Sequence, residues 1–227
     1  MKSVIYIPAR SGSKRIKNKN FKNFNGKPLI FWTIEFALKL KSFDKIIIST
    51  DSNKWGNLIK SEFQSRSTLI DVSIRPARLS TDKSNIIDAI KYDIKKVKFK
   101  LDILLLQPTS PFRSYNKINN AIKYYKKNKI SSLASFQCYD NEKNIFIIHK
   151  KKLYKEKKYY KANGNFYLIS YEKILKFKKF ISEDTKIIVS NNIYENMDID
   201  YNYQWRAAEL IIKNKKLPNH ILDRFRF

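Results

Sequence analysis

The stretch that most constrains this chain is its first thirty residues, which combine a buried strand, a cationic loop and the start of a helix. Residues 4–7 form an apolar run with the length and β-branched content of a buried strand, and Pro8 ends it because proline cannot donate to a strand ladder. Residues 9–20 are too basic to bury. Pro28 then suits the first turn of a helix. This order predicts a polyphosphate-binding turn at the carboxyl end of the first strand of an α/β sheet.

The loop has the composition of an anion-binding site. Small residues let backbone N–H groups approach an anion closely, and neighbouring cations meet its charge. The loop offers both kinds of residue, and its cations are Arg10, Lys14, Arg15, Lys17 and Lys19. A solvated surface loop would have the same composition, so the loop alone leaves both interpretations open.

Counting residues excludes several kinds of site. The only glycines are Gly12, Gly26, Gly56 and Gly164, which cannot form a GxGxxG or a Walker P-loop motif. The two histidines cannot supply HExxH or a three-histidine zinc site, and no GxSxG elbow occurs. The single cysteine, Cys138, excludes an internal disulfide and a CxxC metal site. Catalysis would therefore depend on carboxylates, cations, hydroxyls and backbone amides.

Composition and charge bound the class of protein. A chain of 227 residues with 43% apolar residues predicts one globular domain spanning 1–227. No apolar run approaches the roughly 18 residues of a membrane span, and the amino terminus lacks a signal-peptide core, so we expect a cytoplasmic protein that does not bind membranes. The net charge of +27 favours anionic partners. Because the lysines are spread along the chain and no RNA-binding or zinc-finger signature occurs, we favour a small anionic substrate over nucleic acid.

Hydrophobic periodicity predicts alternating strands and helices along the rest of the chain. We expect strands at 45–50, 72–74, 101–106 and 131–136, and helices at 30–40, 55–63, 86–97, 115–127 and 205–213. The fold class is therefore α/β, with three layers: a mostly parallel sheet with helices on both faces. Asp51, after the second of these strands, is expected to cap the following helix. A short excursion is expected at about 138–162.

Five motifs in order resemble those of one enzyme family. They are PARSGSKR with KNKNFKNFNGKPLI at 8–30, RPARLSTD at 75–82, LLQPTSPFR at 105–113, NGNFY at 163–167 and MDID at 197–200. Together they resemble the CMP-sialic acid synthetases, the acylneuraminate cytidylyltransferases, over nearly the whole chain. The resemblance implies a nucleotide-diphospho-sugar transferase-like sheet and a homodimer joined through the small excursion. It also implies a reaction in which the anomeric hydroxyl of an acidic nine-carbon 2-keto sugar attacks the α-phosphate of CTP and pyrophosphate leaves.

The resemblance also implies the residues that hold the nucleotide. They are Ala9, Arg10, Ser13, Lys19, Asn20, Arg75 and Ser84. Arg10 and Lys19 would act in catalysis, because they would hold the triphosphate and the departing pyrophosphate. Arg75 and Ser84 would lie at the cytosine end. A serine-rich cap before the helix at 86 would explain the same run of residues.

For the acidic sugar, the resemblance implies a second set of contacts: Gln107, Ser110, Arg113, Asn163, Gly164 and Phe180. The two prolines after the strand at 101–106 make a rigid turn, which places its polar residues at the carboxyl end of that strand. An Asn-Gly pair is also a simple turn signal, and Phe180 is equally consistent with a core aromatic.

Asp198 and Asp200 are the candidate metal ligands. In an extended backbone, residues two apart point to the same face, with α-carbons roughly 6.5 Å apart. Two such carboxylates can share Mg²⁺ with phosphate oxygens, and without a cation they would raise each other's pKa. A pair of exposed acids in a loop is the alternative. The resemblance implies that both aspartates are catalytic and that the cofactor is Mg²⁺.

The chain departs from the family pattern in three places. The excursion is shorter than is usual, Asn165 replaces an alanine, and Gln204 replaces an aspartate, a change that we expect to touch a helix cap or an outer contact. The short excursion leaves the identity of the sugar open. Transfer of another nucleotide or to a different acidic sugar, and a basic nucleic-acid-binding protein, therefore remain as alternatives.

Overall fold

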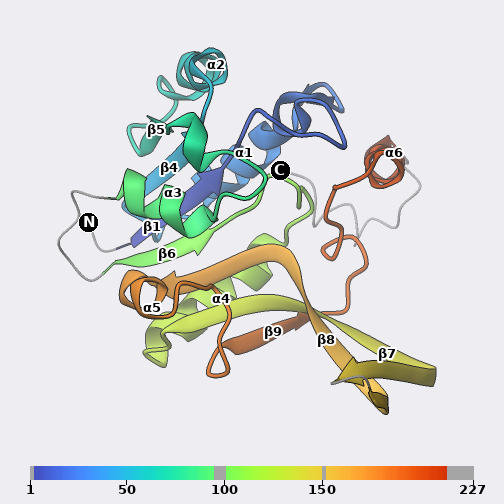
Figure 1. Cartoon of the computed structure of the whole chain (residues 1–227). Helices are drawn as coiled ribbons and strands as arrows, with labels where there is room; N and C mark the ends of the chain where they lie inside the picture. Colours follow the sequence, from blue (N-terminus) through green and yellow to red (C-terminus); the bar gives the residue numbers. More distant parts are fainter. Residues whose placement is uncertain (1–2, 95–100, 150–151, 214–227) are drawn as a thin grey trace.

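A seven-stranded sheet forms the centre of the molecule (Figure 1). The computed structural model describes residues 3–94, 101–149 and 152–213, with the backbone alone for 140–149 and 152–157. The strands of this sheet are β1 (Ser3–Pro8), β4 (Lys45–Thr50), β5 (Ile70–Ile74), β6 (Asp102–Leu105), β7 (Ser132–His149), β8 (Lys152–Ser170) and β9 (Lys186–Ser190). Their spatial order is β5-β4-β1-β6-β8-β7-β9.

The sheet is mostly parallel, as predicted. β1 pairs parallel with β4 and β6, β4 with β5, and β7 with β9. β8 is the exception, because it runs antiparallel to both β6 and β7. Burial on both faces explains the continuous apolar sequences of β1, β4 and β6, since strands covered by helices on each side have no solvent face.

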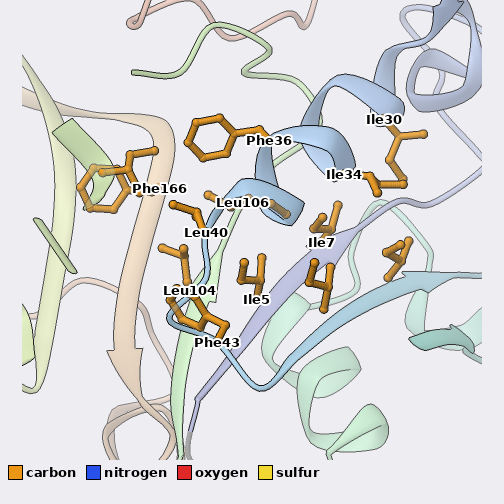
Figure 2. Packing of buried hydrophobic residues seen from close by; sticks show 14 of the residues in the cluster. Ile5, Ile7, Ile30, Ile34, Phe36, Leu40, Phe43, Leu104, Leu106 and Phe166 are labelled. Atoms are coloured by element: carbon orange, nitrogen blue, oxygen red, sulfur yellow. The ribbon is translucent and has the colours of Figure 1, made fainter. Parts of the chain in front are cut away.

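Helices cover both faces of the sheet and make the three expected layers. The helices are α1 (Leu29–Lys39), α2 (Asn53–Phe63), α3 (Ile86–Asp93), α4 (Tyr115–Lys127), α5 (Tyr171–Phe177) and α6 (Asn202–Lys213), with single 3₁₀ turns η1 (Lys19–Phe21) and η2 (Ala77–Leu79). Side chains of α1, α2 and α4 share one core cluster with the sheet, and those of α3 and α5 share a second one on the opposite face. Figure 2 shows the first cluster, in which Ile30, Ile34 and Phe36 of α1 pack towards Ile5 and Leu104.

A third cluster explains how the end of the chain reaches the basic loop. Ile16 and the residues around the small hairpin of β2 (Asn23–Phe24) and β3 (Lys27–Pro28) pack against Ile199 and Trp205. The ring of Trp205 lies edge-on to Phe24, with centroids 5.2 Å apart. This cluster therefore holds the segment before α6 beside the loop that follows β1.

Most of the predicted elements are present. The helix at 115–127 has the predicted bounds, whereas the small β2–β3 hairpin, the two 3₁₀ turns, α5 and β9 were not predicted. The prediction that Asp51 caps α2 is wrong. The hydroxyl of Ser52 accepts the bond from the backbone N–H of Trp55, while Asp51 is turned towards Ser11.

The excursion at 138–162 is the outer part of the β7–β8 hairpin. The two strands continue past the sheet as an antiparallel pair whose register runs to His149 opposite Lys152, with an irregularity between Asp140 and Ile145. Figure 1 shows this pair projecting from the lower edge of the molecule. Its use between two copies stays a prediction. Within the part of the chain that the structure describes, no helix is long and apolar enough to cross a membrane.

Candidate active site

A cavity of about 770 Å³ opens where β1 and β6 end. Four segments that lie far apart in the sequence form its walls: the basic loop after β1, the segment 75–86 after β5, the QPT turn after β6, and the MDID segment. Of the residues predicted to bind substrates, those that line it are Arg10, Ser13, Lys19, Asn20, Arg75, Ser84, Gln107, Asp198 and Asp200. The carboxyl edge of the sheet is where ligands bind in α/β folds, as the sequence predicts.

The basic loop is held in place by hydrogen bonds to its neighbours. The backbone N–H and the hydroxyl of Ser11 donate to the two carboxylate oxygens of Asp51, at 2.7 and 2.9 Å. The amide of Asn20 donates to the carbonyl of Arg10 at 3.0 Å, which ties the two ends of the loop together. Asp51 thus positions the basic loop, whereas the sequence predicted that it would cap a helix.

The loop meets the carboxylate pair directly. The ammonium of Lys19, which is 8% exposed, donates to Oδ1 of Asp200 at 2.6 Å and to the carbonyl of Ile199 at 2.7 Å. Arg15 approaches Oδ2 of Asp200 at 3.1 Å. The prediction that the amino-terminal cations and the carboxyl-terminal acids face one another is therefore confirmed.

The two aspartates have opposite pKa shifts. Burial raises the pKa of Asp198, and the charge of Asp200 adds to the rise, although a hydrogen bond from Thr109 opposes it. Burial would also raise the pKa of Asp200, but Lys19 and Arg15 together outweigh it and lower that pKa. Such a separation is typical of paired carboxylates with different tasks.

The pair fits a hard cation that also binds a phosphate. Oδ1 of Asp198 is buried and has no hydrogen-bond partner among the described residues, which leaves one carboxylate oxygen to be satisfied. No group of three or more histidines, cysteines or acids that could hold a metal occurs in residues 3–94, 101–149 and 152–213. Mg²⁺ is usually held by one or two carboxylates together with substrate phosphates, so two aspartates are enough.

Arg75 and Ser84 lie at the other end of the cavity. Arg75 is 5% exposed, and its Nε donates to Oγ of Ser80 at 2.8 Å. The hydroxyl of Ser84 donates to the carbonyl of Arg78 at 2.8 Å and thereby closes the turn. The cap of α3 is Asn85, which accepts from the N–H of Ile87 at 2.9 Å, so Ser84 is not the cap.

Gln107 lines the cavity, whereas Gly164, Ser110 and Asn163 do not line it but lie close to Gln107 or to its neighbours. Gly164 has a φ of +74°, and a Cβ there would lie 3.0 Å from Oε1 of Gln107 and 3.6 Å from Oδ2 of Asp198. Ser110 is fully buried beside them, and its hydroxyl has no partner within the described part of the chain. The amide of Asn163 is engaged by protein groups, because it donates to Asn196 at 2.7 Å.

Three predicted contacts lie away from the cavity because packing directs their side chains elsewhere. Ala9 is buried in the core, and its N–H donates to the carbonyl of Ser49 at 2.7 Å. Phe180 packs against Tyr167, with ring centroids 5.6 Å apart, in the cluster under α3 and α5. Arg113 is 1% exposed and faces into the protein. The structure therefore does not bring these three to the cavity.

Arg113 is an internal brace. It donates to the carbonyls of Gln107 and Asn165 and, at 3.0 Å, to the hydroxyl of Thr33. Burial lowers its pKa to about 9, although the charge of Asp198 opposes the shift. Asn165, where the family usually has alanine, donates to the carbonyls of Phe112 and Glu195. Both side chains thus support the turn that carries Gln107.

Further polar residues line the cavity. Lys14 and Arg15 were named in the sequence only as cations of the loop, and Thr109 and Asp82 were given no role in binding. Asp82 is the least expected, because it is an acid among cations and pairs with Arg10 and Lys14. The sequence indicated a place for Asp82 at the cavity only because this residue belongs to the RPARLSTD motif.

Comparison with known proteins shows the family of the chain. The family model described as cytidylyltransferase matches residues 4–211. The chain is 34% identical over 231 residues to a CMP-N,N'-diacetyllegionaminic acid synthase of Legionella pneumophila, covering 94% of this chain and 97% of that one. It is 39% identical over 137 residues to an N-acylneuraminate cytidylyltransferase of Escherichia coli, covering 60% of this chain but only 30% of that protein.

Solved structures with low sequence identity share the fold. A CMP:2-keto-3-deoxy-manno-octonic acid synthetase complexed with CTP has a TM-score of 0.64 at 14% identity, covering 93% of this chain and 98% of that one. A 4-diphosphocytidyl-2C-methyl-D-erythritol synthase from Anaerococcus prevotii has a TM-score of 0.66 at 15% identity, covering 94% and 96%. Since the family model spans both the sheet and the carboxylate pair, and a relative matches along almost its whole length, the chain belongs to the cytidylyltransferase family of nucleotidyltransferases, with the CMP-sialic acid synthetases.

Proposed function

We propose that this protein activates an acidic nine-carbon 2-keto sugar, sialic acid or a related nonulosonic acid, with CTP to give the CMP-sugar and pyrophosphate. One observation carries the proposal: the ammonium of Lys19 bonds both Asp200 and the carbonyl of Ile199, so the phosphate-loop cations and the acid pair face one cavity. The names of the relatives, which include legionaminic, neuraminic and pseudaminic acid enzymes, support this class of acceptor.

In this proposal, the basic loop binds the triphosphate and neutralises the charge of the leaving pyrophosphate. Arg10 and Lys19 line the cavity, and the bonds that Asp51 accepts from Ser11 and that Asn20 donates to Arg10 fix the loop that carries them. Phosphoryl and nucleotidyl transfers depend mainly on positioning and on charge stabilisation, which fixed cations supply without reorganising.

The acid pair orients the attacking hydroxyl. Oδ1 of Asp198 has no partner among the described residues, so this carboxylate has an oxygen left with which to hold a cation beside the attacking hydroxyl. Mg²⁺, when bound by Asp198 and Asp200, would supply charge neutralisation at the α-phosphate. Gln107 would orient the sugar beside Gly164, and Arg75 and Ser84 would hold the cytosine end.

The proposal extends to assembly and location. We place the reaction in the cytoplasm, where nucleoside triphosphates are available, and we expect a homodimer. The outer β7–β8 hairpin supports the dimer, because two projecting strands with unpaired edges offer a surface for a second copy.

The test is a panel of the four nucleoside triphosphates with several nonulosonic acids, scored by pyrophosphate release with Mg²⁺. We expect release only with CTP and with at least one of the acids. Asp200→Asn should lower turnover at least about 100-fold, because it removes one metal-binding carboxylate. Asp71→Asn, which removes an equal charge from β5, should keep full turnover.

Two outcomes would contradict the proposal. Full turnover by folded Asp200→Asn would refute the role of the acid pair. Salt-sensitive binding to duplex nucleic acid, with no CTP-dependent thermal shift and no pyrophosphate release, would favour the nucleic-acid-binding alternative instead.

A further inference from the structure

An ion-pair network crosses the mouth of the cavity. Arg10 and Lys14 belong to the basic loop, whereas Asp82 follows η2 on the opposite wall. The guanidinium of Arg10 lies 2.7 Å from Oδ1 of Asp82, and the ammonium of Lys14 lies 2.7 Å from its Oδ2. The carboxylate of Asp82 therefore uses both of its oxygens to hold two cations of the basic loop.

This network contributes little to holding the fold together. The side chains of Arg10, Lys14 and Asp82 are 35%, 84% and 41% exposed, and ion pairs at such exposure add little to stability. The loop is already fixed by Asp51 and Asn20. The consequence of the network lies instead in binding, because any anion that needs Arg10 and Lys14 must first displace Asp82.

We propose that Asp82 is a specificity-determining residue that competes with phosphate groups for Arg10 and Lys14 and thereby weakens the hold of the site on pyrophosphate. The inference rests on the proposed function, in which these cations receive the departing pyrophosphate. After transfer, Asp82 takes the cations back as the product leaves. A diphosphate or triphosphate carries more negative charge than a single phosphate, so both the attraction of Arg10 and Lys14 and the competition by Asp82 should be larger for these ligands.

The test measures binding of inorganic pyrophosphate and of CMP by titration calorimetry. Asp82→Asn keeps the shape of the side chain and removes its charge, and we expect it to bind pyrophosphate about threefold to tenfold more tightly, with a smaller gain for CMP. The matched control is Asp71→Asn. Asp71 pairs with Lys45 at 2.6 Å with a similar exposure, near the amino end of β5, and this variant should not change either affinity.

The outcomes separate this inference from the proposed function. Unchanged or weaker pyrophosphate binding by Asp82→Asn, with an unchanged melting temperature, would overturn the inference. Equal tightening in Asp71→Asn would overturn it too, because net charge alone would then explain the effect. If the unmodified protein binds neither pyrophosphate nor CTP, the proposed function itself fails.

Discussion

Gly164 lies at a position where both the backbone and the surrounding space exclude a larger side chain. Its φ of +74° is strained for residues with a Cβ, and the nearest atoms to that Cβ would be Oε1 of Gln107, Oγ of Ser110 and Oδ2 of Asp198. A methyl group there would therefore press on Oε1 of Gln107, at 3.0 Å, whereas the oxygens of Ser110 and Asp198, at 3.5 and 3.6 Å, would be at ordinary contact distance.

Gly164→Ala is expected to lower turnover at least about tenfold, because a small misplacement of reacting groups is costly. The positive φ should also lower the free energy of unfolding by about 1 kcal/mol. Gly26→Ala is the matched control, since Gly26 has a φ of +94° with no atom within 4 Å of its Cβ position. It should lose similar stability and keep full turnover, as measured by denaturant unfolding and pyrophosphate release. Full activity of Gly164→Ala would contradict this account.

At the scale of an element, α6 is coupled to Asp200, the proposed metal ligand, through its own cap. Oε1 of Gln204 accepts from the backbone N–H groups of Asp200 and Tyr201, at 2.7 and 2.8 Å. The bond from the N–H of Tyr201, directly before α6, to the side chain of Gln204 is the second half of a capping box. It confirms that Gln204 acts at a helix cap. Gln204 therefore holds the backbone of Asp200 and leaves the carboxylate of Asp200 to face Lys19 and Arg15.

Gln204→Ala should lower the free energy of unfolding by about 1 kcal/mol, because two N–H groups lose their acceptor. Turnover should fall as well, since the backbone of Asp200 is no longer held. Gln204→Glu keeps the acceptor and adds a favourable charge at the helix amino terminus, so it should restore both properties. A loss of turnover in Gln204→Ala that Gln204→Glu does not rescue would show that the cap is not the cause.

At the scale of the whole molecule, Asp102 links the central sheet to α4 and makes stability depend on pH. Its carboxylate accepts from the hydroxyl of Tyr125 at 2.8 Å. Burial raises the pKa of Asp102, although the bond from Tyr125 and the charge of Lys126 oppose the rise. Because the folded-state pKa lies above the unfolded one, the folded protein binds more protons between the two values, and stability falls as pH rises through that window.

Asp102→Asn should therefore raise the denaturation midpoint at pH 7 and remove this fall, which begins near the unfolded value of about 4. Tyr125→Phe should act in the opposite direction, because it removes the bond that lowers the pKa of Asp102, and the pH dependence should become steeper. Denaturant titrations between pH 4 and pH 7 measure both effects. Identical pH profiles for the unmodified protein and Asp102→Asn would contradict the assignment.

Interactions between neighbours in the chain could be predicted well. Apolar runs and turn residues predicted β1, β4, β5 and β6, the bounds of α4 and the order of the motifs, because strand and helix periodicity depend on residues a few positions apart. The outer β7–β8 hairpin has a strand-like apolar run at 145–148 between lysines, from which a short excursion was expected but not the long antiparallel pair, and β9 was not predicted.

Contacts between distant residues could not be predicted in the same way. Residue types alone do not distinguish Arg10, which lines the cavity, from Arg113, which braces the core, because their directions depend on packing against other elements. Asp51 and Ser52 are equally good helix caps, and the presence of Ser11, 40 positions away, decides between them. Lys19 likewise meets Ile199, 180 positions away, only because the third core cluster packs the end of the chain on the basic loop. Local chemistry thus supplies the groups of the site, and long-range packing decides which of them face the same cavity.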